Sequence, residues 1–244
     1  MEKSVDKLII IQARMGSSRL PGKVLKSLGQ TSILDHVVQR CRQINGDAVI
    51  LATSVLPADD AISSWCQMNQ VACFRGSEED VLSRYAACAE LYQPNWVIRV
   101  TADCPFLDVQ LANKMMGVLA HTDADLISLD RDLPRGLAVE VMRYSALLAV
   151  HERGTEARHR EHVTYYAYEH PEQFKLAYVH VPDVLHHPHL RMTVDTVEDY
   201  QLCQTLAQHI PDIVQVPSAQ IVQYLLEHPE VARLNAHIQQ KPVC

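Results

Sequence analysis

Short apolar runs alternate with longer amphipathic segments along most of the chain. Residues Leu8–Ile11 are apolar at every position, which is typical of a strand covered on both faces of a parallel sheet. Runs of similar length predict further strands at residues 48–52, 71–74, 96–101, 125–129, 176–181 and 190–194.

Between these runs, apolar residues recur at the spacing of a helix that packs one face against a sheet. The predicted helices lie at 33–41, 81–92 and 221–226, and another begins after Thr196, where Thr196 and Asp199 have the form of an N-terminal capping arrangement. Strand–helix alternation predicts a three-layer α/β/α fold, in which ligands bind where strands end and loops begin.

The chain has 244 residues, a length that suits one α/β domain spanning residues 1–244. Residues 131–188 depart from the alternation, because they are rich in charged, His and Tyr side chains and contain few long apolar runs. We interpret this stretch as a lobe inserted into the same domain.

The net charge limits the partners that are expected, and the cysteine content indicates the redox environment. The net charge of -7 argues against the broad basic face that nucleic acids and anionic membranes require, so neither is expected as a partner. Seven cysteines, without a CxxC spacing, indicate reduced thiols. The first apolar run is too short for a signal peptide or a membrane span, and we expect a cytoplasmic protein.

A candidate phosphate-binding loop follows the first predicted strand. It combines a glycine, two adjacent serines, two arginines and a Pro-Gly-Lys sequence, which together supply backbone N–H groups, hydroxyls and positive charge for a triphosphate. The loop is not a Walker A motif, because Ser17 stands where that motif needs glycine and Val24 follows the lysine. The predicted nucleotide-binding residues are Ala13, Arg14, Gly16, Ser17, Ser18, Arg19 and Lys23.

Two aspartates follow predicted strands and are candidates for holding a hard cation. Asp103 comes after the strand 96–101, and Asp195 comes after the strand 190–194. Mg²⁺ prefers a few carboxylates completed by phosphate oxygens and water, which suits two aspartates from separate strand ends. Asp195 also directly precedes a predicted helix, so its alternative role is a helix N-cap.

Several motifs resemble those of one known family. The segment 11–25, IQARMGSSRLPGKVL, looks like the signature of the spore coat polysaccharide biosynthesis protein F family, which resembles the CMP-Kdo and CMP-sialate synthetases. The resemblance covers nearly the whole chain and implies a Rossmann-like nucleotidyltransferase fold. It continues through residues 75–82, 101–105, 135–140, 160–164 and 193–199.

The resemblance implies transfer of CMP from CTP to a sugar, perhaps an acidic one, with release of pyrophosphate. By match to the family, Asp103 and Asp195 hold Mg²⁺, while Arg14 and Lys23 stabilise the α-phosphate and the departing pyrophosphate. It also implies a homodimer in which the inserted lobe contacts the partner. Base recognition is expected at Thr53, Ser54 and Arg75, and acceptor contacts at Glu140, Arg160, Glu161 and His162.

Alternatives remain open at this point. Asp130 and Asp132 have the DxD form of glycosyltransferases that consume a sugar nucleotide. A nucleotide-binding module without catalysis is a second alternative. Thr101 stands where Kdo-activating enzymes carry Gln, so the resemblance leaves the acceptor undefined.

Overall fold

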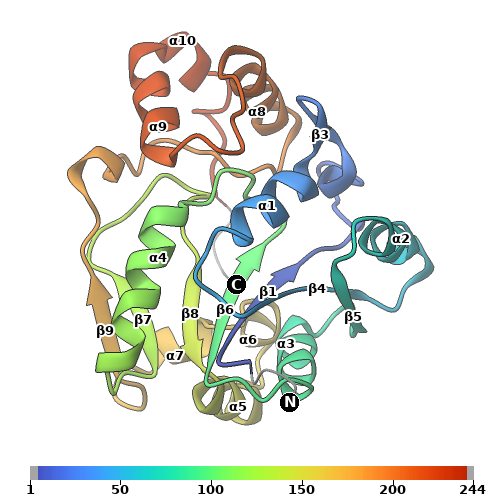
Figure 1. Cartoon of the computed structure of the whole chain (residues 1–244), viewed down its shortest axis with the longest axis vertical. Helices are drawn as coiled ribbons and strands as arrows, with labels where there is room; N and C mark the ends of the chain where they lie inside the picture. The colour runs from blue at the N-terminus through green and yellow to red at the C-terminus, as the bar shows by residue number, and fades with distance from the viewer. Residues whose placement is uncertain (1–4, 241–244) are drawn as a thin grey trace.

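Successive residues of strand β1 (Lys7–Gln12) point to opposite faces of a central sheet in the computed structural model, which describes residues 5–240. Leu8 and Ile10 are fully buried in one apolar cluster, and Ile9 and Ile11 are fully buried in a second. Because side chains alternate along a strand, the two clusters lie on opposite faces of the sheet. The fold therefore has the predicted three layers (Figure 1).

Seven strands form the sheet in the order β5-β4-β1-β6-β8-β7-β9. Strands β1, β4, β5 and β6 are parallel, β8 is antiparallel to both of its neighbours, and β9 is parallel to β7. The strands after β1 are β4 (Ala48–Ser54), β5 (Ala72–Gly76), β6 (Trp96–Thr101), β7 (Leu126–Leu129), β8 (Glu140–Arg143) and β9 (Leu176–Val179), and a separate hairpin pairs β2 (Ser27–Leu28) with β3 (Thr31–Ser32).

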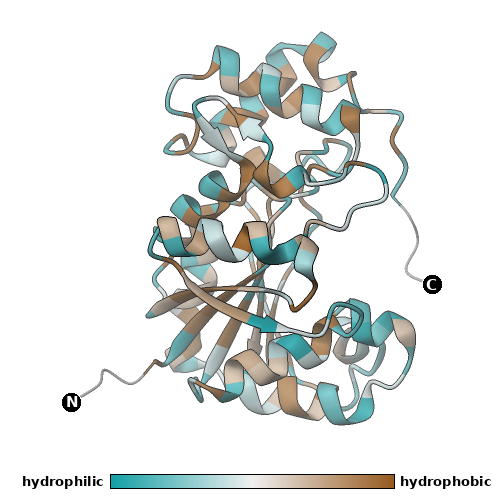
Figure 2. Ribbon diagram, turned by 90° about the vertical axis from the view of Figure 1, so that its right-hand side faces the viewer, coloured by the Kyte–Doolittle hydropathy of each residue, from teal (hydrophilic) through white to brown (hydrophobic). Residues whose placement is uncertain are grey.

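Helices cover both faces of the sheet, and their apolar stripes turn toward the strands (Figure 2). One cluster contains buried residues of α1 (Ile33–Cys41), α2 (Asp60–Met68), α4 (Val109–Val118), α8 (Val197–His209), α9 (Ser218–Glu227) and α10 (Pro229–Ala232). The other contains buried residues of α3 (Val81–Glu90), α5 (Tyr144–Arg153) and α7 (Tyr165–Glu169), near the short helix α6 (Ala157–Glu161).

One predicted strand, 190–194, is wrong. The segment forms a single bridge between Arg191 and Arg135 and no ladder. Leu190, Met192 and Val194 are buried in a hydrophobic cluster, so their apolar character reflects packing of an extended segment into the core. The helix expected after it is confirmed, because the side chain of Thr196 caps the first turn of α8 and accepts a hydrogen bond from the N–H of Asp199.

The stretch interpreted as an inserted lobe contributes to the sheet itself. Within 131–188, strand β8 lies between β6 and β7, and β9 forms an edge. The four residues of β8 were not predicted, because their apolar positions are too few to form a clear run. Helices α5 and α6 of this stretch lie beside α3, and α7 contacts α6 (Figure 1).

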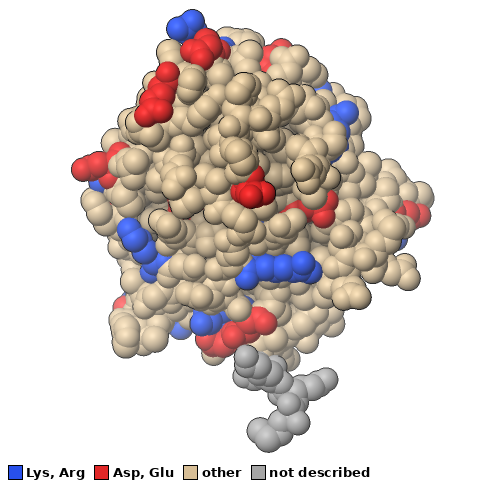
Figure 3. Space-filling model, turned by 45° about the horizontal axis from the view of Figure 1, so that its top comes forward, with Lys and Arg blue, Asp and Glu red and all other residues tan. Residues whose placement is uncertain are grey.

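The distribution of basic side chains and the state of the cysteines can be compared with what the composition predicts. In the view of Figure 3, Lys and Arg side chains are scattered among neutral residues without a broad basic patch. Between residues 5 and 240, no helix has the length and apolar character needed to cross a bilayer. Six cysteines in that range are free thiols, and Cys244 lies outside the described residues.

Candidate functional site

A cavity of about 800 Å³ opens at the carboxyl ends of β1 and β6. This edge is where parallel α/β sheets bind ligands, because loops that follow adjacent strands meet there. Segments far apart in the sequence line it, namely 12–19, 99–104, 127–140 and 161–168, together with Lys23, Thr193, Asp195 and Gln240.

The predicted phosphate loop folds back on itself beside β1. Gly22 takes a left-handed conformation with φ of 65°, which a residue without a side chain adopts readily. Its N–H donates to the carbonyl of Met15 at 3.1 Å, and the N–H of Leu20 donates to the hydroxyl of Ser17 at 3.3 Å. These contacts close the loop and place Lys23 at the start of a short 3₁₀ helix, Lys23–Leu25.

Several N–H groups of this loop are left for a ligand. No acceptor within residues 5–240 receives the backbone N–H of Arg14, Gly16, Ser17, Ser18 or Arg19. Backbone N–H groups gathered in a loop form an anion-binding concavity, especially with cationic side chains beside them. The loop can therefore bind phosphate.

Asp59, which sequence reasoning missed, fastens this loop to the sheet. It is 1% exposed and accepts hydrogen bonds from the N–H of Met15 at 2.6 Å and from the N–H and hydroxyl of Ser54. From sequence, Asp59 is indistinguishable from an ordinary acidic residue before a helix. A fully buried carboxylate with three donors is visible only in the folded chain.

The residues expected to recognise the base lie beside the cavity rather than in its lining. Thr53 and Ser54 are fully buried at the end of β4. Arg75 donates to the carbonyls of Ser54 and Leu56 at 2.9 and 3.0 Å and pairs with Asp60. These contacts shape the edge formed by β4 and β5, and a role in base recognition stays a prediction.

Lys23 joins the two candidate metal ligands. Its Nζ lies 2.7 Å from Asp103 Oδ2 and 2.8 Å from Asp195 Oδ1. The N–H of Val194 donates to the carbonyl of Asp103 at 2.8 Å, which ties the two aspartate segments together. Asp195 is not the N-cap of α8, because Thr196 has that role.

A buried network fixes the orientation of Asp195. Arg191 lies 2.7 Å from Asp195 Oδ2 and 2.8 Å from Asp199, which is fully buried. Asp199 accepts the N–H of Asp195 at 2.9 Å, and Asn235 donates to Asp199 at 2.8 Å. These contacts fix the position of Asp195 and leave its Oδ1 facing Lys23.

Electrostatics keep this cluster ionised. Burial opposes the charge on Lys23, but Asp103 and Asp195 outweigh it and raise the pKa of the lysine above its ordinary value. Burial also opposes the charge on Asp195, but Lys23, Arg19 and Arg191 outweigh it and lower the pKa of that carboxyl. At neutral pH Lys23 is therefore an ammonium and Asp195 a carboxylate.

The donor set fits a hard divalent cation that also needs ligands from the substrate. Asp103 and Asp195 reach the same point in space and offer oxygens, which Mg²⁺ prefers. No group of three or more His, Cys, Asp or Glu residues suited to a metal occurs in the part of the chain that the structure describes. An ion here would therefore complete its shell with phosphate oxygens and water.

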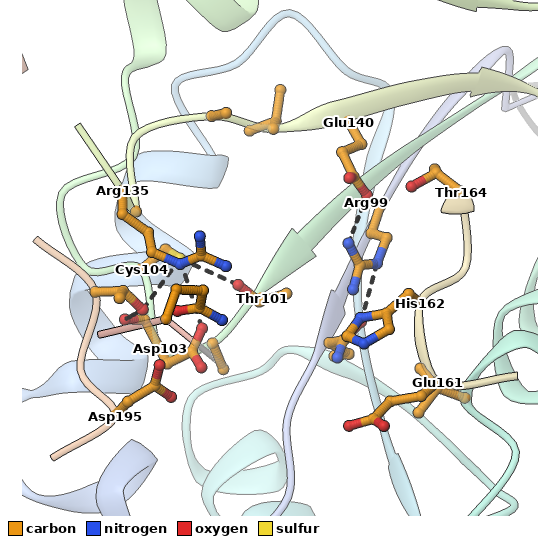
Figure 4. Close-up of a pocket in the computed structure, with 18 of the residues that line it drawn as sticks. Arg99, Thr101, Asp103, Cys104, Arg135, Glu140, Glu161, His162, Thr164 and Asp195 are labelled. Atoms are coloured by element: carbon orange, nitrogen blue, oxygen red, sulfur yellow. Dashed lines mark hydrogen bonds and ion pairs between the residues drawn. The ribbon is translucent and has the colours of Figure 1, made fainter. Parts of the chain in front are cut away.

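The other end of the cavity carries most of the predicted acceptor residues. Glu140 of β8 pairs with Arg99 of β6 at 2.5 Å, and Glu161 and His162 line the same end (Figure 4). Burial lowers the pKa of His162, so the ring is neutral at pH 7. Arg160 instead pairs with Asp80 at 3.5 Å, outside the lining.

The cavity lining contains arginines that were not predicted as site residues, among them Arg99 and Arg135. Arg99 is a lone charge inside the otherwise buried strand β6, a signal that marks a strand beside a polar site. Arg135 lies near Asp103 and Asp195 in Figure 4. Burial lowers the pKa of Arg135, and the neighbouring Arg191 adds to that effect.

The DxD residues have other contacts. Asp130 accepts from the N–H of Val181 at 2.9 Å and lies 2.7 Å from His180, so it joins the ends of β7 and β9. Asp132 lines the cavity with an exposed side chain.

Comparisons with known proteins show the family of the chain. The sequence model of the family described as Cytidylyltransferase matches residues 8–235. The chain is similar to the spore coat polysaccharide biosynthesis protein SpsF of Bacillus subtilis, with 36% identity over 93% of this chain and 97% of that protein. A partial match, 29% identical over 52% of this chain and 50% of the relative, links it to 3-deoxy-manno-octulosonate cytidylyltransferase of Polynucleobacter necessarius.

A solved structure shows the same fold. The cytidylyltransferase from Leptospira borgpetersenii serovar Hardjo-bovis superposes with a TM-score of 0.87 and 26% identity, covering 97% of this chain and 99% of that one.

Proposed function

Because the chain belongs to the cytidylyltransferase family and is a nucleotidyltransferase, we propose that it transfers CMP from CTP to a sugar acid and releases pyrophosphate. The observation that carries the proposal is the convergence of Lys23, Asp103 and Asp195 beside a loop with free N–H groups. Two relatives, one named a spore coat polysaccharide biosynthesis protein and one named a 3-deoxy-manno-octulosonate cytidylyltransferase, support the choice of a sugar.

The reaction joins an acceptor hydroxyl to the α-phosphorus of CTP. The hydroxyl oxygen forms the new bond, its proton is released, and the bond from the α-phosphorus to the bridging oxygen breaks, freeing pyrophosphate. Such transfer depends mainly on positioning and on neutralising charge. The loop N–H groups, Arg14, Arg19 and Lys23 supply that neutralisation for the triphosphate.

Asp103 and Asp195 are the residues that would hold Mg²⁺. When bound, the ion supplies further neutralisation of phosphate charge and increases the acidity of a nearby hydroxyl. Arg191 and Asp199 keep Asp195 in place for that task.

The acceptor occupies the end of the cavity near Glu140 and His162 in this proposal. Arg135, near Asp103 and Asp195, supplies a positive charge suited to a carboxylate, and Glu140 together with neutral His162 suits sugar hydroxyls. This assignment places the acceptor between β8 and the segment before α7.

A pyrophosphate-release assay tests the proposal. CTP, UTP, GTP and ATP are each combined with a panel of sugar acids and neutral sugars in the presence of Mg²⁺. Release that requires CTP together with a sugar acid is the expected result. Sugar transfer without pyrophosphate would instead identify a glycosyltransferase, and nucleotide binding without turnover would identify a binding module.

We also propose a cytoplasmic homodimer. Free thiols support a reducing compartment, and Tyr178 on the edge strand β9 leaves 63% of its surface exposed for a partner subunit. Size-exclusion chromatography with light scattering measures the mass, and a monomer would contradict the dimer alone.

A further inference from the structure

Lys23 is held by the same two oxygens that are proposed to bind the metal. Its ammonium lies 2.7 Å from Asp103 Oδ2 and 2.8 Å from Asp195 Oδ1, and the lysine side chain is 12% exposed. Mg²⁺ binds oxygens at about 2.1 Å, so an ion bridging this pair needs the space that Nζ fills. The two cations also repel each other, which disfavours their binding to the pair at the same time.

We propose that Lys23 and the divalent ion compete for Asp103 and Asp195, and that the ion enters together with the triphosphate. The phosphate oxygens give the lysine a replacement partner when it leaves the carboxylates. This proposal rests on the proposed function, because it assigns a triphosphate to the loop. Without a triphosphate, Lys23 neutralises the carboxylates and disfavours the free ion.

The side chain of Lys23 can turn toward a new anion, whereas the carboxylate of Asp195 and the backbone of Asp103 are held in place. Lys23 directly follows Gly22 and has a long side chain with three donors, which can turn toward a new anion without a change in the sheet. Asp195 is anchored by Arg191 at 2.7 Å and through its N–H by Asp199 at 2.9 Å. Asp103 is anchored through its carbonyl by Val194.

Removal of a functional residue ordinarily weakens binding. If Lys23 competes with the ion, its removal should instead strengthen metal binding. The affinity of the nucleotide-free protein for Mn²⁺, followed by the electron paramagnetic resonance of free Mn²⁺, should rise in Lys23→Gln. The expected rise is about tenfold or more, because losing even one of the two competing charge-assisted contacts of Lys23 corresponds to about tenfold. Asp103→Asn should abolish this binding and so identify the site.

Lys26→Gln is the matched control. It removes the same charge three residues away, where the ammonium lies 5.9 Å from the ring centre of Tyr200 rather than between the aspartates. Its Mn²⁺ affinity should equal that of the unmodified protein. Unchanged or weaker binding in Lys23→Gln overturns the proposal, and so does an equal rise in both variants, since net charge would then explain it.

A second measurement uses the unmodified chain and does not depend on a folded variant. Acetic anhydride modifies accessible lysines, and mass spectrometry of the peptides gives the rate at each one. Mn²⁺ at the concentration found to saturate the nucleotide-free site should increase the rate at Lys23 and leave the rate at Lys26 unchanged, because the ion displaces only the ammonium of Lys23. A constant rate at Lys23 overturns the proposal.

Neither readout needs turnover. If the nucleotide panel releases no pyrophosphate, the proposed function fails while the competition for Asp103 and Asp195 is still decided by Mn²⁺ binding and by lysine labelling. If CMP transfer is found but Lys23→Gln binds Mn²⁺ no more tightly, the competition fails and the proposed function stands.

Discussion

The carboxylate of Asp59 accepts a hydrogen bond from the backbone N–H of Met15 at 2.6 Å, across 44 positions of sequence. The same carboxylate accepts the N–H and hydroxyl of Ser54 at the end of β4. One buried side chain therefore sets the position of the phosphate loop relative to the sheet.

Asp59→Ala should lower the free energy of unfolding by about 2 kcal/mol or more, because it leaves several donors without a partner in a buried place. The KM for the nucleotide should rise as the loop loosens. Urea denaturation measures the stability. Asp60→Ala is the control, since that side chain is 63% exposed and its pair with Arg75 should contribute about 0.5 kcal/mol.

Gly136 packs tightly against the segment that leads to Asp195. A Cβ there would lie 2.7 Å from the backbone N of Thr193, and φ is +97°. Gly136→Ala should lower the free energy of unfolding by about 2 kcal/mol or more and reduce activity, because the segment must shift. Gly117→Ala, in α4 with open space around it, should instead stabilise by about 0.5–1 kcal/mol. Equal thermal shifts in the two variants would contradict this account.

Lys23→Ala and Asp103→Ala should each slow pyrophosphate release by about two orders of magnitude or more, because each removes charge held in place for the reaction. Circular dichroism should show that both variants fold. Near-normal turnover in either variant would remove that residue from the proposed mechanism.

His162 should titrate below its ordinary value near 6.5. Burial is the main cause, and Arg99 and Arg135 add to it, while Glu161 and Glu140 oppose it. Because the folded chain binds this proton less readily than the unfolded chain, stability falls as pH drops below about 6.5. Histidine NMR signals, assigned with His162→Gln, give the midpoint. A midpoint above 6.5 would show that Glu140 and Glu161 raise the pKa of His162 more than burial and the two arginines lower it.

Asp130→Asn should leave pyrophosphate release unchanged, because Asp130 contacts His180 and the N–H of Val181 rather than the phosphate loop. The comparison is made at equal folded fraction, measured by thermal melting. Loss of sugar transfer in this variant, in an assay with sugar nucleotides, would favour the glycosyltransferase alternative.

The local pattern determined much of the fold. The apolar run at Leu8–Ile11 and the helical spacing at 33–41 depend on neighbouring residues, so periodicity reveals them directly. Thr196 and Asp199 likewise form their cap within a single turn. The family motifs singled out Lys23, Asp103 and Asp195 as a set.

Only the tertiary structure decided which of these side chains meet. That Lys23 contacts both aspartates depends on how β1, β6 and the segment before α8 are placed by the sheet, and no periodicity encodes a distance between them. The pattern of the extended segment 190–194 predicts a strand, because an extended segment buried without strand pairing has the same apolar alternation as a paired strand. The sequence did not predict strand β8 or the burial of Asp59, for a related reason. Short segments and single polar residues gain their roles from long-range contacts, which neighbours in sequence do not specify.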